Sequence, residues 1–150
     1  MNIILVTGGA RSGKSSYVEA RARALAGDQV SYIATAASSD DDMRDRIGKH
    51  RANRPRQWET LEASNDVAAA IRSARQHVVV LDCITMLASQ VITGRSQSRD
   101  SVDSATEAAI ASLLDASARR NGTLFAVTNE VGMSIHPPTA VRLKKIRLPS

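Results

Sequence analysis

Residues 8–15 read Gly-Gly-Ala-Arg-Ser-Gly-Lys-Ser and directly follow the apolar run of residues 3–6. This stretch fits the phosphate-loop pattern G-x-x-x-x-G-K-[ST] at every fixed position. Glycines let the backbone curl so that its N–H groups surround a phosphate, and the start of a helix adds about half a positive charge there. We therefore expect a strand, this phosphate loop, and a helix over residues 14–26 that ends at Gly27.

Short apolar runs alternate with helical patterns along the rest of the chain. Further strands are expected over residues 30–35, 57–62, 77–83 and 123–129, and the apolar run of the first strand predicts burial on both of its faces. Helices are expected over residues 40–54, from a cap at Ser64 or Asn65 to Ala74, over 85–92 and over 102–120. Crossovers of this kind place successive strands parallel, so the pattern indicates a layered α/β domain with a mainly parallel sheet.

Three residues have the chemistry that such a loop requires. Lys14 is placed to reach the β- and γ-phosphates of a nucleotide, and the Ser15 hydroxyl to join the shell of a Mg²⁺ ion. Asp82 follows the apolar run 78–81, at the strand end where ligands bind in open α/β sheets. We predict that its carboxylate supports Mg²⁺ beside Ser15; the alternative is a hydrogen-bonded aspartate that orients its own loop.

His50 lies in a basic stretch with Arg51 and Arg54. Guanidinium groups fork onto phosphate oxygens, and a neutral imidazole is a competent nucleophile near neutral pH. From spacing alone, the alternative is a histidine with a purely structural place in the core or at the surface. Trp58 and Cys83 are interpreted as packing residues.

The composition excludes several classes of protein. Apolar residues make up 43% of the chain and charged residues 23%, which argues against disorder. The net charge of +5 comes mainly from residues 139–150, which hold four of the 20 basic residues and no acidic one. With this distribution and few aromatic residues for base stacking, we expect no nucleic-acid partner. No segment has the length and apolarity of a membrane span, and a single cysteine fits a reducing compartment, so we expect a cytoplasmic protein.

Five ordered motifs resemble those of the bifunctional adenosylcobinamide kinase/adenosylcobinamide-phosphate guanylyltransferase family. They are the segment 4–15, Tyr-Ile-Ala-Thr-Ala at 32–36, Arg-Ile-x-x-His-Arg-x-x-Arg-Pro-x-x-Trp at 46–58, Leu-Asp-Cys-Ile-Thr at 81–85, and Thr-Asn-Glu-Val-Gly at 128–132. The resemblance implies phosphorylation of adenosylcobinamide by a nucleoside triphosphate, and transfer of GMP from GTP to the product through a GMP–histidine intermediate. It also implies a three-layer, RecA-like P-loop NTPase fold, use of GTP, ATP and Mg²⁺, and a homo-oligomer.

By position, the resemblance assigns the histidine that carries GMP to His50, and His50 and Lys14 are the expected catalytic residues. The implied nucleotide contacts are Gly8, Gly9, Ala10, Arg11, Ser12, Gly13, Lys14, Ser15, Ala34, Thr35, Ala36, Arg51, Ala52, Asn53, Arg54, Glu62 and Asp82, with Ser15 and Asp82 as metal ligands. After residues 134–137 the chain departs from the family pattern. We therefore expect a nucleotide-binding domain over residues 1–138, a basic tail over 139–150, and a sheet truncated at its C-terminal edge. Two rival hypotheses remain: a nucleotide-binding relative without turnover, and a P-loop kinase for another small alcohol.

Overall fold

The computed structural model describes residues 1–9, 11–35, 55–63, 66–85, 87 and 99–130. Within them, five strands form one parallel sheet in the order β1-β5-β4-β2-β3. The strands are β1 (Asn2–Gly8), β2 (Val30–Ala34), β3 (Glu59–Glu62), β4 (Val78–Asp82) and β5 (Thr123–Asn129), and the helices are α1 (Lys14–Ala26), α3 (Val67–Ser73) and α5 (Arg99–Ala118). These elements confirm the predicted α/β fold with a parallel sheet.

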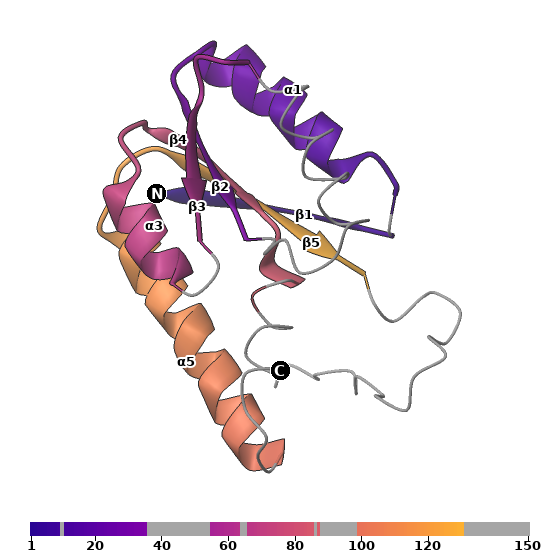
Figure 1. The fold of residues 1–150 in the computed structure, drawn as a ribbon, viewed down its shortest axis with the longest axis vertical. Coiled ribbons are helices and arrows are strands. Elements are labelled where there is room, and N and C mark those ends of the chain that lie inside the picture. The colour runs from indigo at the N-terminus through magenta and orange to yellow at the C-terminus, as the bar shows by residue number, and fades with distance from the viewer. Residues whose placement is uncertain (10, 36–54, 64–65, 86, 88–98, 131–150) are drawn as a thin grey trace.

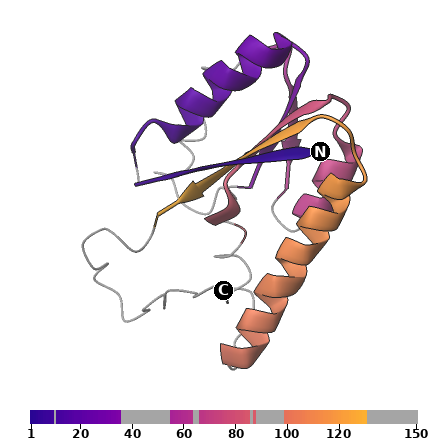
Figure 2. The same ribbon diagram turned by 180° about the vertical axis from the view of Figure 1, so that it is seen from behind.

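The sheet is the middle layer of three. Figure 1 shows α1 on one side of it and α3 with α5 on the other, and Figure 2 shows the same arrangement from behind. Alternate residues of the inner strands supply the two cores. Tyr32, Val80 and Phe125 pack on the side of α1, whereas Ile33 and Leu81 pack with α3 and α5. Because both faces are covered, the inner strands are apolar almost throughout.

β1 differs from the prediction that it is buried on both faces. Among the described residues it pairs with β5 alone and so lies at an edge of the sheet. The side chains of Ile3, Ile4 and Leu5 are 42%, 44% and 58% exposed. The prediction was wrong because an apolar run records a preference for burial, whereas the neighbours of a strand depend on segments far away in the sequence.

Two helix starts also differ from the sequence-based expectation. The side chain of Asp66 caps α3, because its Oδ1 accepts a hydrogen bond from the Ala69 N–H at 2.8 Å. A cap at Ser64 or Asn65 was expected; both lie outside the described residues, and Asp66 supplies the cap. Helix α5 begins at Arg99, three residues before the expected start. The predicted helix over residues 40–54 lies outside the described residues, and of the helix over 85–92 only its beginning is described.

Candidate nucleotide-binding site

The carboxyl ends of all five described strands lie along one edge of the sheet. In the strand register, Ala34 pairs with both Glu62 and Asp82, and Gly8 pairs with Asn129. Parallel strands bind ligands at this edge. The fold therefore brings the phosphate loop after β1 to the same edge as the predicted contacts on β2, β3 and β4.

The phosphate loop has the curled backbone that its sequence predicts. Arg11 and Gly13 both adopt positive φ angles, 59° and 82°, and Gly13 is the residue from which α1 starts. A Cβ at Gly8 would come within 3.1 Å of the Ser12 Oγ, so a side chain there would crowd the loop. The Tyr17 N–H donates to the Gly13 carbonyl at 2.9 Å, which makes this the first turn of α1. The N-terminus of α1 thus opens onto the loop, as an anion site requires.

The Lys14 ammonium group is held against the loop that precedes it. Its Nζ donates to the Gly9 carbonyl and to the Ser12 Oγ, the latter at 3.3 Å. Both acceptors are neutral, so each binds the ammonium group less strongly than a charged phosphate oxygen would. The cation is therefore already at the loop before any anion arrives.

Asp82 and its neighbours tie the ends of β2 and β4 together. The Tyr32 hydroxyl donates to the Asp82 Oδ2 at 2.6 Å. The Thr35 hydroxyl accepts from the Cys83 N–H and donates to the Cys83 carbonyl, both at 2.8 Å, and the Thr35 N–H donates to the Asp82 carbonyl at 3.1 Å. Thr35 is wholly buried, so its side chain serves this junction, and its contact with a nucleotide stays a prediction.

The end of β5 lies between the phosphate loop and Asp82, an arrangement the sequence could not reveal. The Glu130 N–H donates to the Gly8 carbonyl at 2.9 Å. On the other side, the Asn129 N–H donates to the Thr85 Oγ1 at 2.8 Å, and the Thr85 and Thr128 hydroxyls are 3.2 Å apart. The motif at residues 128–132 signalled this segment, but only the strand order shows that it separates the two halves of the site.

The oxygen atoms of Ser15 and Asp82 fit Mg²⁺, which prefers oxygen ligands. β1 and β4 are two strand spacings apart, which puts the loop about 10 Å from the end of β4. Among the described residues, no three His, Cys, Asp or Glu side chains gather into a metal site. Mg²⁺ is commonly held by one or two protein ligands together with substrate phosphates and waters.

Several predicted site residues lie outside the described part of the chain. They are Ala10, Ala36, His50, Arg51, Ala52, Asn53 and Arg54. The tail over residues 139–150 is also outside it.

The packing roles of Trp58 and Cys83 are confirmed: both are buried in the core on the α1 side, and the Trp58 Nε1 donates to the Gly27 carbonyl at 3.0 Å. None of the described helices combines the length and apolarity needed to cross a membrane.

The parallel sheet, the phosphate loop and the helix that follows it define a nucleotide-binding domain of the RecA-like P-loop class. The fold is similar to that of an ATPase from the type III secretion system of pathogenic bacteria, with a TM-score of 0.60 over 91% of this chain and 46% of that one. The sequence identity of 13% restricts this likeness to the fold, and the chain spans about half the length of that ATPase.

The particular family follows from sequence comparison. The profile of the family described as "Cobinamide kinase / cobinamide phosphate guanyltransferase" matches residues 4–144. The bifunctional adenosylcobalamin biosynthesis protein CobU of Escherichia coli is 40% identical, with 90% of this chain and 78% of that protein aligned. CobP of Pseudomonas aeruginosa, which bears the same description, is 38% identical, with 89% and 74% aligned. The chain belongs to this family, so it is a transferase with cobinamide kinase and cobinamide phosphate guanylyltransferase activities and nucleotide substrates.

Proposed function

We propose that this site binds a nucleoside triphosphate with Mg²⁺, phosphorylates adenosylcobinamide, and then transfers GMP from GTP to the phosphate so formed. One observation carries the proposal: the curled loop before α1 holds the Lys14 ammonium at the carboxyl edge where Asp82 also lies. The loop N–H groups and Lys14 bind the phosphates, and Ser15 and Asp82 are the residues that would hold Mg²⁺. A bound Mg²⁺ would neutralise charge on the phosphate oxygens.

In the kinase step, the hydroxyl oxygen of the aminopropanol group forms a bond to the γ-phosphorus of the nucleotide. The bond from that phosphorus to the β-phosphate oxygen breaks, the nucleoside diphosphate leaves, and the hydroxyl proton passes to solvent or to a base. Lys14 stabilises the charge on the oxygens of the transferred group. This role requires an ammonium beside the loop, which is where Lys14 lies.

In the guanylyltransferase step, a ring nitrogen of His50 attacks the α-phosphorus of GTP and pyrophosphate leaves. A phosphate oxygen of adenosylcobinamide phosphate then attacks the same phosphorus, the bond to His50 breaks, and the product is adenosylcobinamide-GDP. A covalent intermediate divides one difficult transfer into two easier displacements. Arg51, Ala52, Asn53 and Arg54 follow His50 directly, and the two guanidinium groups would pair with phosphate oxygens.

Glu62 and the 34–36 segment are proposed as contacts for the rest of the nucleotide. β3 is four strand spacings from β1, so Glu62 lies about 19 Å along the edge from the strand that leads into the phosphate loop.

We further infer a cytoplasmic homo-oligomer. Cys83 is buried and is the single cysteine of the chain, which suits a reducing compartment, and the exposed apolar side chains of β1 suit a subunit contact.

The test is incubation of the protein with GTP labelled at the α-phosphate, followed by denaturation and measurement of retained label. We expect wild-type protein and His77→Ala to retain label, because His77 is exposed at the opposite end of β4. His50→Ala is expected to lose the label and to keep the kinase step. Label that survives His50→Ala would refute the assignment to His50. GTP binding with neither label nor corrinoid product would instead indicate a nucleotide-binding protein without turnover.

A further inference from the structure

The contact between Tyr32 and Asp82 lies within the candidate site, but the sequence motifs assign it no role. Tyr32 belongs to β2 and pairs with Val80 of β4, whereas Asp82 pairs with Ala34, two residues further along. Residues two apart on a strand point to the same face. The phenol ring therefore runs along the sheet toward the carboxylate, on the face covered by α1, which is also the face to which the phosphate loop leads.

The hydrogen bond makes the two carboxylate oxygens of Asp82 unequal. The Tyr32 hydroxyl donates to Oδ2 of Asp82 at 2.6 Å. The Tyr32 side chain is wholly buried in the core on the α1 side, so the ring has no room to swing its hydroxyl away. Among the hydrogen bonds of the described residues none reaches Oδ1, so this oxygen could accept a cation or a water of its shell without giving up a partner.

A carboxylate with one oxygen already engaged by a hydrogen bond favours contact through the other, and this preference can discriminate between cations. Mg²⁺ is small, keeps several of its waters and accepts single carboxylate oxygens. Ca²⁺ takes more oxygen ligands and commonly binds both oxygens of one carboxylate. We propose that Tyr32 is a positioning residue that holds Asp82 for one-oxygen contact and thereby makes Mg²⁺ the preferred cation over Ca²⁺. This inference rests on the proposed metal role of Asp82.

The first experiment measures GTP binding by calorimetry in the presence of Mg²⁺ alone or Ca²⁺ alone. Tyr32→Phe keeps the ring and removes the hydroxyl. We expect it to weaken Mg²⁺-supported GTP binding by about tenfold, because the loss of a hydrogen bond to a charged group changes affinities by about that factor. We also expect it to reduce the ratio of the GTP dissociation constant in Ca²⁺ to that in Mg²⁺. The control is Ser117→Ala, which removes another fully buried hydroxyl, one that donates to the Leu113 carbonyl at 2.9 Å within α5. It should leave the ratio unchanged.

Asp82→Asn separates failure of this inference from failure of the proposed function. If Asp82→Asn leaves Mg²⁺-supported binding intact, the metal role of Asp82 is wrong. If Asp82→Asn weakens it and Tyr32→Phe leaves both the affinity and the Ca²⁺/Mg²⁺ ratio unchanged, Tyr32 does not position the carboxylate. A purely structural role for Tyr32 would lower stability against urea and would leave the ratio where it was.

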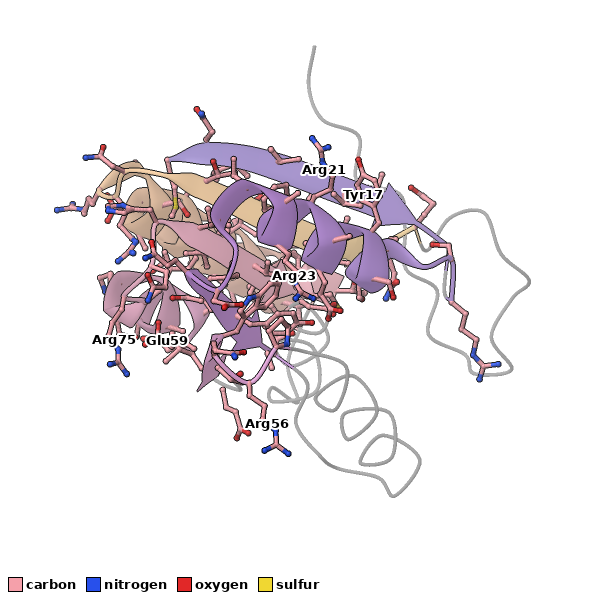
Figure 3. The ribbon with its side chains drawn as sticks, turned by 90° about the horizontal axis from the view of Figure 1, so that it is seen from above. Tyr17, Arg21, Arg23, Arg56, Glu59 and Arg75 are labelled. Atoms are coloured by element: carbon pink, nitrogen blue, oxygen red, sulfur yellow. The ribbon has the colours of Figure 1, made fainter. Side chains whose placement is uncertain are left out.

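A second readout does not depend on how well Tyr32→Phe folds. The chain has two tyrosines, so labelling with 3-fluorotyrosine gives two ¹⁹F signals. Tyr17 lies on α1 and is 57% exposed, and it serves as the reference (Figure 3). We expect Asp82→Asn, and addition of Mg²⁺ with GTP, to shift the Tyr32 signal. If the ¹⁹F chemical shift of Tyr32 is the same in Asp82→Asn as in wild-type protein, the proposal is wrong.

Discussion

Glu59 holds together the end of the sheet that lies opposite the candidate site. Its Oε2 accepts hydrogen bonds from the Ser31 hydroxyl and from the Arg75 N–H, the latter at 2.9 Å, and its Oε1 accepts from the Arg75 Nε at 2.8 Å. Figure 3 shows Glu59 and Arg75 next to each other. The Glu59 side chain is 11% exposed and Ser31 is wholly buried, whereas the Arg75 side chain is 82% exposed. The inner bond to Ser31 therefore matters more than the outer ion pair.

The size of the effect follows from these contacts. Glu59→Ala leaves the buried Ser31 hydroxyl without this acceptor, and we expect a loss of about 2–3 kcal/mol in the free energy of unfolding. Glu59→Gln keeps an oxygen for Ser31 and loses the charge that faces the exposed Arg75, so about 1 kcal/mol is expected. The matched control is Asp115→Asn, which breaks an exposed ion pair with Arg119 within α5 and should leave the urea midpoint unchanged.

The pH dependence adds a second measurement of the same group. Burial raises the pKa of Glu59, but hydrogen bonds from Ser31 and Arg75 outweigh it, so the pKa lies below its ordinary value. The ionised form thus stabilises the fold above the unfolded-state pKa of about 4.3, and this stabilisation is lost as the pH falls through the lower folded-state value. The free energy of unfolding of wild-type protein should therefore fall more steeply below about pH 5 than that of Glu59→Gln.

Urea unfolding monitored by tryptophan fluorescence suits this test. Trp58 is the only tryptophan of the chain, adjoins Glu59 in sequence and is 5% exposed. A double-mutant cycle with Ser31→Ala isolates the inner hydrogen bond, and a coupling of about 0.5–3 kcal/mol is expected. The reasoning fails if Glu59→Ala costs no more than Asp115→Asn, or if wild-type protein and Glu59→Gln respond equally to acid.

Two further predictions concern stability and are checked by the same unfolding assay. Gly13→Ala should cost about 1–2 kcal/mol through backbone strain alone, because φ at Gly13 is +82° and an added Cβ meets no atom within 4 Å. Gly9→Ala, which adds a Cβ to equally open space without a positive φ, should cost less, and equal costs would contradict the argument. Asp66→Ala should cost about 1 kcal/mol through loss of the α3 cap to Ala69, whereas Asp66→Asn keeps an acceptor and should cost little. A cost from Asp66→Asn as large as that from Asp66→Ala would mean that charge, not capping, is what matters.

Local sequence determined the elements and the chemical character of the site. The phosphate loop could be identified from residues 8–15 because its function depends on backbone curl and on a helix start, and both are local properties. The strand β5 was predicted with its observed bounds because an apolar run between turn residues is also a local signal. The resemblance to a family added the reaction, which no periodicity contains.

The tertiary structure decided which of these segments meet. Among the described strands, it placed β1 at a sheet edge despite its apolar sequence, and it inserted β5 between the phosphate loop and β4. It also brought Tyr32 to Asp82 across 50 residues of sequence. Strand order and register arise from pairing between distant segments, which depends on the whole packed sheet, so a single sequence read locally fixes neither of them.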